Sequence, residues 1–306
     1  MTVAVPGMTG PVRPRLLLDS PSLIYRAFFA LPPTIRAPTG RSVNAVRGYL
    51  DMCSRLLVDR RPSGMVHVLD ADWRPAFRVA AYAGYKENRR PDPPELPPQF
   101  ELLDEILDAA GVERAEAPGV EADDVLGTLA TRATADAPVE IVSGDRDLLQ
   151  LVRDPAVAVL FTVRGVSGLD RYDEAAVRTR YGVPPAAYAD MAILRGDASD
   201  DLPGVAGIGA KTAAALIAEH GSLAELRRRV AVSRPQGVTP RIATALRDAA
   251  SYLDAMTVVV PVRCDLELTE TGRRDPDVAR LREIGEREAV DGPVERLLEA
   301  LAGLRP

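Results

Sequence analysis

The sequence predicts an α/β protein in which helices flank a largely parallel sheet, with a helical region after it. Short apolar runs typical of strands occur at residues 15–19, 65–70, 139–144 and 157–161. Stretches with the apolar spacing of amphipathic helices lie between them, at 43–57, 99–111 and 121–133. From about residue 186 to 255 the spacing is helical throughout. Alternating strands and helices favour parallel pairing, because each helix carries the chain back to the starting edge of the sheet.

The expected elements divide the chain into four consecutive parts. Residues 1–14 are expected to be a flexible tail and 15–185 an α/β core, in which Gly111 ends a helix and the proline-rich PDPPELPP (91–98) forms an extended surface connection. Residues 186–255 form the helical region. Residues 256–306 are expected to return to the core as a strand, 256–268, and a C-terminal helix that starts near residue 292.

The amino-acid composition restricts the kinds of catalytic and metal-binding site that the chain can form. At 306 residues it can bury a sizeable core, and it has no apolar run long enough to span a membrane and no signal peptide. Cys53 and Cys264 are isolated, which is typical of reduced thiols in a cytoplasmic protein. With two histidines, His-rich zinc sites and His-based nucleophilic triads are close to excluded. A metal here would be held by oxygen, which favours magnesium or manganese.

Acidic residues gather at positions where an α/β sheet forms its ligand site. Three predicted strands are followed by aspartates, namely Asp19, Asp70 and Asp145. Such sites lie outside the carboxyl ends of the strands. Further acids occur in three short motifs: Glu121, Asp123 and Asp124 in GVEADDVLG, Asp147 in SGDRDLLQLV, and Asp197 and Asp200 in RGDASDDLPG. Taken singly, each is best explained as a solvated acid or a helix N-cap.

Together, these acids are harder to explain without bound cations. Like charges that converge repel one another unless positive charge lies among them. A carboxylate cluster without histidine or cysteine suits two divalent cations about 4 Å apart, the arrangement that hydrolyses phosphate esters.

Five motifs with compatible spacing resemble the bacterial 5′ nuclease family, which comprises the 5′–3′ exonuclease domains of DNA polymerase I and the stand-alone flap endonucleases. The motifs are LLLDSPSLIYRAFFALP, VLDADWRPAFR with YAGYKENR, GVEADDVLGTLA, SGDRDLLQLV and GDASDDLPGVAGIGAKTA, and they span residues 15 to about 268. The resemblance implies a PIN-like α/β fold with a helix-hairpin-helix region, and two-metal hydrolysis of DNA that leaves 5′-phosphate and 3′-hydroxyl ends. Because the chain ends at Pro306, a free-standing nuclease is expected.

The resemblance also implies roles for particular residues. The metal ligands would be Asp19, Asp70, Glu121, Asp123, Asp124, Asp145, Asp147, Asp197 and Asp200, with Asp145 between two Mg²⁺ or Mn²⁺ ions. Asp147 and Asp200 would serve the second ion, and Asp19, Asp70, Glu121 and Asp123 the first. Without these nine carboxylates the net charge would rise from −6 to +3, which leaves a mildly basic surface for DNA.

The only lysines, Lys86 and Lys211, both fall in these motifs, among 38 lysines and arginines. By resemblance, residues 71–98 form an arch over the metals, and Arg78, Tyr85 and Lys86 contact the scissile phosphate. A solvated basic face is the simpler explanation of this segment. Lysine is a compact point charge where arginine is a planar fork, so a crowded two-metal site would accept only the former. Tyr85 offers a stacking face for a base or is merely packed.

The second lysine lies in GVAGIGAKTAAAL, which has the form of a helix-hairpin-helix element. Its glycines permit a tight turn, and the helix N-terminus faces a phosphate. The DNA contacts implied here are Gly207, Gly209, Lys211 and Thr212, with a potassium ion in the turn, and elsewhere Arg26, Arg89 and Arg195. Phe28, Phe29 and Leu31 would either stack on the duplex end or pack in the core.

Four positions depart from the family pattern. Ser20 replaces a glycine and could restrict the backbone beside Asp19. An extra residue after Asp70 leaves Asp72 as an alternative ligand. Asp201 adds an acid beside Asp200, and Ala210 replaces a glutamate with little expected effect.

The expected function is cleavage of 5′-flap, nicked or gapped duplex DNA by a monomer in the bacterial cytoplasm, with no membrane partner, in replication and repair. The sequence leaves the balance between flap endonuclease and exonuclease activity open. A PIN-type ribonuclease is a second interpretation, which the helix-hairpin-helix motif and the basic arch disfavour. A non-catalytic DNA-binding module is a third, and it would be expected to have lost a carboxylate.

Overall fold

A central sheet organises the computed structural model, which describes residues 12–163, 165–233 and 235–304. The tail expected at 1–14 lies outside the described residues up to residue 11. Within them, the strands are β1 (Arg15–Asp19), β2 (Met65–Val68), β3 (Glu113–Glu116), β4 (Val139–Ser143), β5 (Val157–Thr162), β6 (Leu169–Tyr172) and β7 (Thr269–Thr271). Their order is β6-β5-β4-β1-β2-β3-β7. The five middle strands are parallel and the two edge strands antiparallel, which confirms the predicted sheet.

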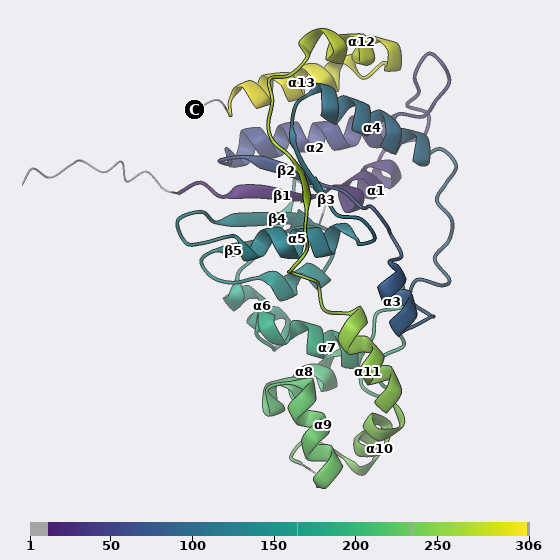
Figure 1. The fold of residues 1–306 in the computed structure, drawn as a ribbon, viewed down its shortest axis with the longest axis vertical. Coiled ribbons are helices and arrows are strands. Elements are labelled where there is room, and N and C mark those ends of the chain that lie inside the picture. The colour runs from purple at the N-terminus through teal and green to yellow at the C-terminus, as the bar shows by residue number, and fades with distance from the viewer. Residues whose placement is uncertain (1–11, 164, 234, 305–306) are drawn as a thin grey trace, which may run out of the picture.

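Alternation along β1 divides the core into two layers. Leu16 and Leu18 face one layer and Leu17 the other. The first layer contains α1 (Ser20–Ala30), α2 (Asn44–Arg60), α4 (Pro97–Ala109), α12 (Val278–Glu288) and α13 (Asp291–Ala302). The second begins with α5 (Ala122–Thr131). Figure 1 shows the two groups of helices on opposite sides of the strands.

The helical region continues the second layer. It consists of α7 (Tyr188–Arg195), α8 (Ala210–His220), α9 (Leu223–Val232), α10 (Pro240–Asp248) and α11 (Ala250–Val259), and α6 (Glu174–Tyr181) precedes it. A short 3₁₀ turn at 147–151 lies between β4 and β5, and two more, at 185–187 and 198–200, lie before and after α7. Buried residues of α7 to α11 belong to the same apolar cluster as those of α5. The region therefore shares a core with the sheet, below which it lies in Figure 1.

The prediction of a strand at residues 256–268 is wrong. Residues 256–259 form the last turn of α11, and the chain then runs extended before β7, which pairs antiparallel with β3. The β-branched run TVVV favours a strand locally, but Leu253, Met256 and Val259 recur at helical spacing and are all buried. Packing thus overrides the local preference. The C-terminal part holds two helices, α12 and α13, where one was predicted.

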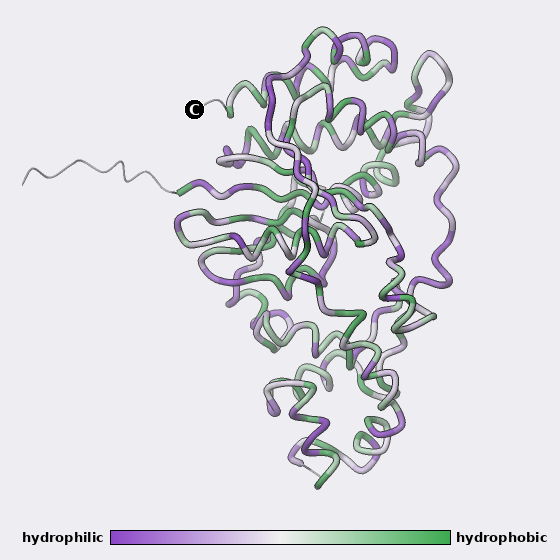
Figure 2. The backbone as a smooth tube through the Cα atoms, viewed as in Figure 1, coloured by the Kyte–Doolittle hydropathy of each residue, from purple (hydrophilic) through white to green (hydrophobic). Residues whose placement is uncertain are grey.

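The arch segment, residues 71–98, contains the short helix α3 (Ala76–Ala81) and a long connection to α4. This connection is mostly hydrophilic and stands beside the body of the protein in Figure 2. It is anchored where the Lys86 amide donates to the Asp200 carbonyl at 3.1 Å and the Asn88 amide donates to the Asp201 carboxylate at 2.8 Å. The arch segment therefore rests on the turn that carries Asp200.

No helix in the described ranges is both long and apolar enough to cross a membrane.

Candidate active site at the carboxyl edge of the sheet

Three acids reach the same edge of the sheet because β4, β1 and β2 are parallel neighbours. Asp19 is the last residue of β1, Asp70 lies two residues after β2, and Asp145 lies two residues after β4. The carboxyl ends of parallel strands meet at one edge, which is where open α/β sheets bind ligands. The convergence that the sequence predicted for these three residues is therefore present.

Ser143 connects the first and last of these acids. The Asp19 carboxylate caps α1 by accepting from the Ser22 amide at 3.2 Å, and it also accepts a hydrogen bond from the Ser143 hydroxyl. The same hydroxyl accepts from the Asp145 amide at 2.8 Å. One serine at the end of β4 thus fixes the Asp19 carboxylate and the backbone that carries Asp145.

The N-terminus of α5 supplies the next acids. The Asp70 carboxylate accepts from the Ala122 amide at 2.6 Å, which places it beside Glu121, the N-cap residue of this helix. Asp123 lies in its first turn. Carboxylates are favoured here because the free amides and the helix dipole present positive charge.

Asp145 is the electrostatic centre of the acids. The pKa of Asp19 is raised to about 7, mainly by burial and also by the charge of Asp145. Burial and then Asp145 also raise the pKa values of Asp123 and Asp147 well above the ordinary range. The pKa of Asp200 is raised to about 6, mainly by burial; Lys86 lowers it, and the charge of Asp145 raises it. The charge of Asp145 therefore raises the pKa of all four acids.

The acids fall into two groups around this centre. Asp147 interacts with Asp197 and Asp200 of the 198–200 turn as well as with Asp145. On the other side, Asp123 interacts with Asp19 and Glu121. The pKa of Asp70 is raised to about 6, mainly by burial and also by the charge of Glu121. Eight of the nine predicted acids are linked in this way by mutual repulsion.

The donor set fits divalent cations bound by oxygen. Asp145 is exposed while Asp19 and Glu121 are buried, so an ion can reach the acids from solvent on the side of Asp145. Across residues 12–163, 165–233 and 235–304, no three acidic, histidine or cysteine side chains already close on one point as metal ligands. Repelling carboxylates without a cation between them are expected to stay apart. Hard oxygen ligands of this kind suit Mg²⁺ or Mn²⁺.

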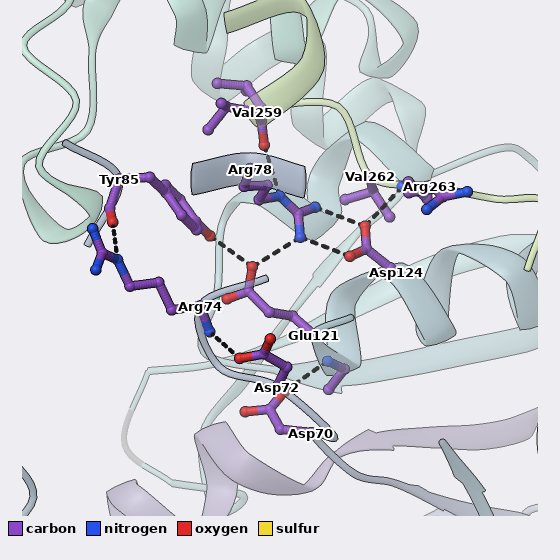
Figure 3. Close-up of polar contacts among 12 residues, drawn as sticks. Asp70, Asp72, Arg74, Arg78, Tyr85, Glu121, Asp124, Val259, Val262 and Arg263 are labelled. Atoms are coloured by element: carbon purple, nitrogen blue, oxygen red, sulfur yellow. Dashed lines mark hydrogen bonds and ion pairs between the residues drawn. The ribbon is translucent and has the colours of Figure 1, made fainter. Parts of the chain in front are cut away.

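Asp124 differs from the other eight acids. It is fully buried, and its two oxygens accept from NH1 and NH2 of Arg78 at 2.7 Å each. One oxygen also accepts from the Arg263 amide at 2.9 Å. Figure 3 shows this carboxylate enclosed between the arginine and the chain after α11. Its oxygens are therefore already satisfied by protein donors.

Arg78 is correspondingly turned away from solvent, with 3 % of its surface exposed. Besides Asp124, its guanidinium donates to Glu121 at 2.8 Å and to the Val259 carbonyl at 2.9 Å (Figure 3). It joins α3, the start of α5 and the end of α11. The phosphate contact expected of Arg78 would require it to leave these partners.

Tyr85 and Lys86 complete the surroundings of Glu121. The Tyr85 hydroxyl donates to Glu121 at 2.7 Å, and the Lys86 ammonium contacts the other oxygen of Glu121 and lies 3.8 Å from Asp200. Although burial lowers the pKa of Lys86, the charges of Glu121 and Asp200 outweigh it and raise that pKa. Lys86 also has a φ of +50°, a left-handed conformation that is uncommon for residues with a side chain. This lysine is the cation between the two groups of acids.

The predicted arginines lie around the same edge. Arg26 of α1 lies against Gly144, where a Cβ would come within 2.8 Å of its NH2. Arg195, at the end of α7, pairs with Asp197 at 3.5 Å. Arg89 of the arch segment contacts aromatic rings.

The helix-hairpin-helix residues form a separate feature at the start of α8. Gly207 adopts a φ of +79°, Gly209 is the N-cap, and both are exposed together with Lys211. Thr212 follows within the first turn. A groove of about 620 Å³ runs from this point to the acidic site, and its cationic lining is Arg146, Arg180, Arg195 and Lys211.

The departures from the family pattern have local explanations. Ser20 is buried and shares a 2.7 Å hydrogen bond with the Tyr49 hydroxyl. The Asp72 carboxylate accepts from the Arg74 amide at 3.0 Å, whereas Asp70 is the residue held beside Glu121. Asp201 holds Asn88 of the arch segment. Ala210 opens α8.

The three residues expected either to stack on the duplex end or to pack in the core differ in exposure. Phe29 is 70 % exposed at the end of α1, while Phe28 and Leu31 are half-buried.

Sequence reasoning missed three contributors to this site, namely Ser143, Arg146 and Arg180. Ser143 stands at the start of the SGDRDLLQLV motif, which could have pointed to it, whereas Arg180 lies on α6, outside all five motifs. Arg146 stands between two of the predicted acids and could have been noticed there.

Comparison with known proteins gives a consistent match over the whole fold. Residues 14–182 match the family model described as 5′–3′ exonuclease, N-terminal resolvase-like domain, and residues 183–279 match the 5′–3′ exonuclease, C-terminal SAM fold. A 5′–3′ exonuclease of Streptomyces coelicolor is 46 % identical over 94 % of this chain and 99 % of its own length. A 5′–3′ exonuclease of Mycobacterium tuberculosis is 44 % identical over 94 % of this chain and 98 % of its own length.

Among solved structures, the fold resembles the bacteriophage T5 flap endonuclease in a pseudo-enzyme–product complex with DNA and metal ions. The TM-score is 0.64 at 19 % identity, with 95 % of this chain and 100 % of the other covered. At this identity the likeness concerns the fold.

Proposed function

The chain belongs to the 5′–3′ exonuclease family, and from this membership and the geometry of its acidic site we propose that it hydrolyses DNA at 5′ flaps and 5′ ends with two divalent metal ions. The observation that carries the proposal is the position of Asp145, whose charge acts on four surrounding aspartates. A carboxylate at the centre of two acid groups is the group that two cations would share.

The two acid groups divide the ligands. Asp19, Asp70, Glu121 and Asp123 would hold the first ion, and Asp147, Asp197 and Asp200 the second, with Asp145 between them. Mg²⁺ or Mn²⁺ bound here would activate the attacking water and neutralise charge on the phosphate. We leave Asp124 out of this set, because both of its oxygens are bound by Arg78.

Three residues of the arch segment, Lys86, Arg78 and Tyr85, take two different roles. Lys86 lies between Glu121 and Asp200, where its ammonium can turn from these acids to a phosphate oxygen placed among them. Arg78 and Tyr85 both donate to Glu121, so they orient a metal ligand. We therefore assign Lys86 to the scissile phosphate and the other two residues to positioning.

Duplex DNA would lie along the basic groove. Arg146, Arg180, Arg195 and Lys211 line it and can contact successive phosphates without reading the sequence of bases. The amides at the start of α8 and the turn at Gly207 and Gly209 would bind a further phosphate, with K⁺ in the turn, and Arg26 would act near the acids.

This groove also separates the main proposal from a PIN-type ribonuclease, because it continues the acidic site into a helical region suited to duplex DNA. A 5′-flap, nicked or gapped duplex is the proposed substrate, bound by a monomer in the bacterial cytoplasm. The division of the chain at residues 185 and 255 remains part of the proposal.

The test is cleavage of a synthetic 5′-flap duplex in Mg²⁺ or Mn²⁺, with Asp145→Asn as the inactive control. A label at the flap end distinguishes release of the whole flap from release of mononucleotides. A flap-length product that the variant does not form supports the proposal, and a ladder of mononucleotides shifts the assignment to exonuclease activity. Tight binding without cleavage in either metal would contradict catalysis and leave a DNA-binding protein.

A further inference from the structure

Trp73 is an exposed aromatic residue beside the acidic site that the proposed reaction does not yet use. It is the only tryptophan in the sequence, and 49 % of its surface is exposed. It follows Asp72 in the loop between Asp70 and α3. Single exposed apolar side chains are common on proteins, so exposure alone carries no conclusion. Two further observations about Trp73 do support a conclusion.

The backbone on both sides of Trp73 is fixed. The Asp72 amide donates to the Val120 carbonyl at 3.1 Å, and the Asp72 carboxylate accepts from the Arg74 amide at 3.0 Å. The Arg74 side chain then donates to the carbonyls of Tyr85 at 2.6 Å and Ala83 at 2.8 Å. Figure 3 shows Asp72 and Arg74 in this arrangement beside Asp70. The loop thus presents an apolar ring at a defined position instead of burying it.

The ring is paired with a cation that has aromatic neighbours. The guanidinium carbon of Arg89 lies 5.7 Å from the centre of the Trp73 ring and 5.7 Å from the centre of the Tyr25 ring. Tyr25 is held in turn by Phe100, at 6.1 Å between ring centres, and by its hydroxyl, which donates to Asp92. A guanidinium bound by the faces of aromatic rings keeps its N–H donors for another group, such as a phosphate.

An exposed aromatic face next to an arginine is the pairing that binds single-stranded nucleic acid, because each nucleotide offers one flat base and one phosphate. We propose that the Trp73 indole is the stacking platform for an unpaired base of the 5′ strand, and that Arg89 binds the phosphate beside that base. The inference rests on the proposed nuclease function, since it places this strand next to Asp70. The incoming base takes the ring face that Arg89 now covers, and the guanidinium turns to the phosphate.

The single tryptophan makes the contact directly measurable, because all tryptophan fluorescence comes from residue 73. The protein is titrated in Ca²⁺ with two flap duplexes that differ only in the flap, one with thymine bases and one with abasic sites. Stacking predicts saturable quenching by the thymine flap only. In a separate binding assay, Trp73→Ala is expected to weaken the thymine complex roughly 5- to 150-fold, with Trp73→Phe between it and the wild type. The abasic complex should change little.

The control is Val58→Ala, which removes an exposed apolar side chain from α2 and should bind both flaps like the wild type. Equal quenching by both flaps, or an equal loss of affinity for both flaps in Trp73→Ala, would overturn the stacking role. Cleavage by the wild type under Mg²⁺ in the same preparation would then show that the proposed function stands without it. If the wild type neither binds nor cleaves either duplex, the proposed function fails and this inference fails with it.

Discussion

The guanidinium of Arg78 donates to both oxygens of Asp124, at 2.7 Å each, in a fully buried ion pair. The pair joins the arch segment to α5, and through the Val259 carbonyl it also reaches the end of α11. Because Arg78 contacts Glu121 as well, the same side chain ties the helical region to a proposed metal ligand. The arch, the sheet edge and the helical region therefore meet at one arginine.

Breaking this pair should be costly for folding. We expect Arg78→Met to lower the free energy of unfolding by about 3–5 kcal/mol, because it leaves Asp124 buried without its partner. The double variant Arg78→Met/Asp124→Leu should recover much of the loss. Urea unfolding measures both values.

The matched control for that experiment is Arg282→Met, which removes an exposed arginine paired with Glu295 and should lower the free energy of unfolding far less, because solvent screens this pair. Equal effects of the two single variants would show that the buried pair contributes no more to the free energy of unfolding than an exposed pair.

We predict that position 86 requires lysine for its shape as well as its charge. We expect Lys86→Ala to lower the single-turnover cleavage rate about 10²- to 10³-fold, by the loss of one cation at the phosphate. Lys86→Arg should not restore the rate, because the planar fork does not fit between Glu121 and Asp200. Glu87→Ala, an exposed neighbour, should cleave like the wild type. Full activity of the arginine variant would refute the steric explanation.

The basic groove should contribute to DNA affinity through charge. Arg180→Ala and Lys211→Ala should each weaken duplex binding and reduce the slope of log affinity against log salt by about 0.9. The cleavage rate at saturating protein should be unchanged, because neither residue lies among the acids. Arg228→Ala, on the exposed face of α9, serves as the control. Unchanged salt slopes would place the DNA elsewhere.

The raised pKa values of the site acids predict that the metal-free protein loses stability as pH rises. Folded-state pKa values of about 7 for Asp19 and about 6 for Asp70 and Asp200 exceed their ordinary value. The native state then binds protons more tightly than the unfolded state. This stabilisation is complete below the unfolded pKa and is lost as pH rises through about 6 to 7.

Thermal unfolding in EDTA at pH 6 and pH 8, each compared with Mg²⁺, measures this effect. Mg²⁺ should stabilise the protein much more at pH 8, where the acids are charged. Buried His67, with a pKa lowered to about 3, works in the opposite direction on acidification. Its contribution is the same with and without metal and cancels in the comparison. Equal Mg²⁺ effects at the two pH values would contradict the proposed cluster.

Much of this arrangement could be predicted from the sequence because it depends on local patterns. Apolar runs that end in Asp19, Asp70 and Asp145 specify the strands, their parallel pairing and hence one acidic edge. The sequence could not reveal the partner of Asp124, because Arg78 reaches it across 46 residues. For the same reason Asp124 resembled its neighbour Asp123, although Asp124 is paired with Arg78 and Asp123 lies among the site acids.

The strand expected at 256–268 fails for a related cause. A β-branched run has a local preference for extended structure, but the outcome depends on which distant surface its side chains pack against. The place of Arg180 in the groove likewise depends on packing. Only in the folded chain does α6 bring Arg180 into the same groove as Lys211 of α8.

The measurement that tests the central claim most directly is the number of Mn²⁺ ions bound, counted by electron paramagnetic resonance with cleaved DNA product present. If Asp145 joins two groups of metal ligands, the wild type binds two ions and Asp145→Asn binds fewer, while Glu87→Ala keeps both. Wild-type protein that binds no Mn²⁺, or an Asp145→Asn variant that binds as many ions as the wild type, would contradict the account.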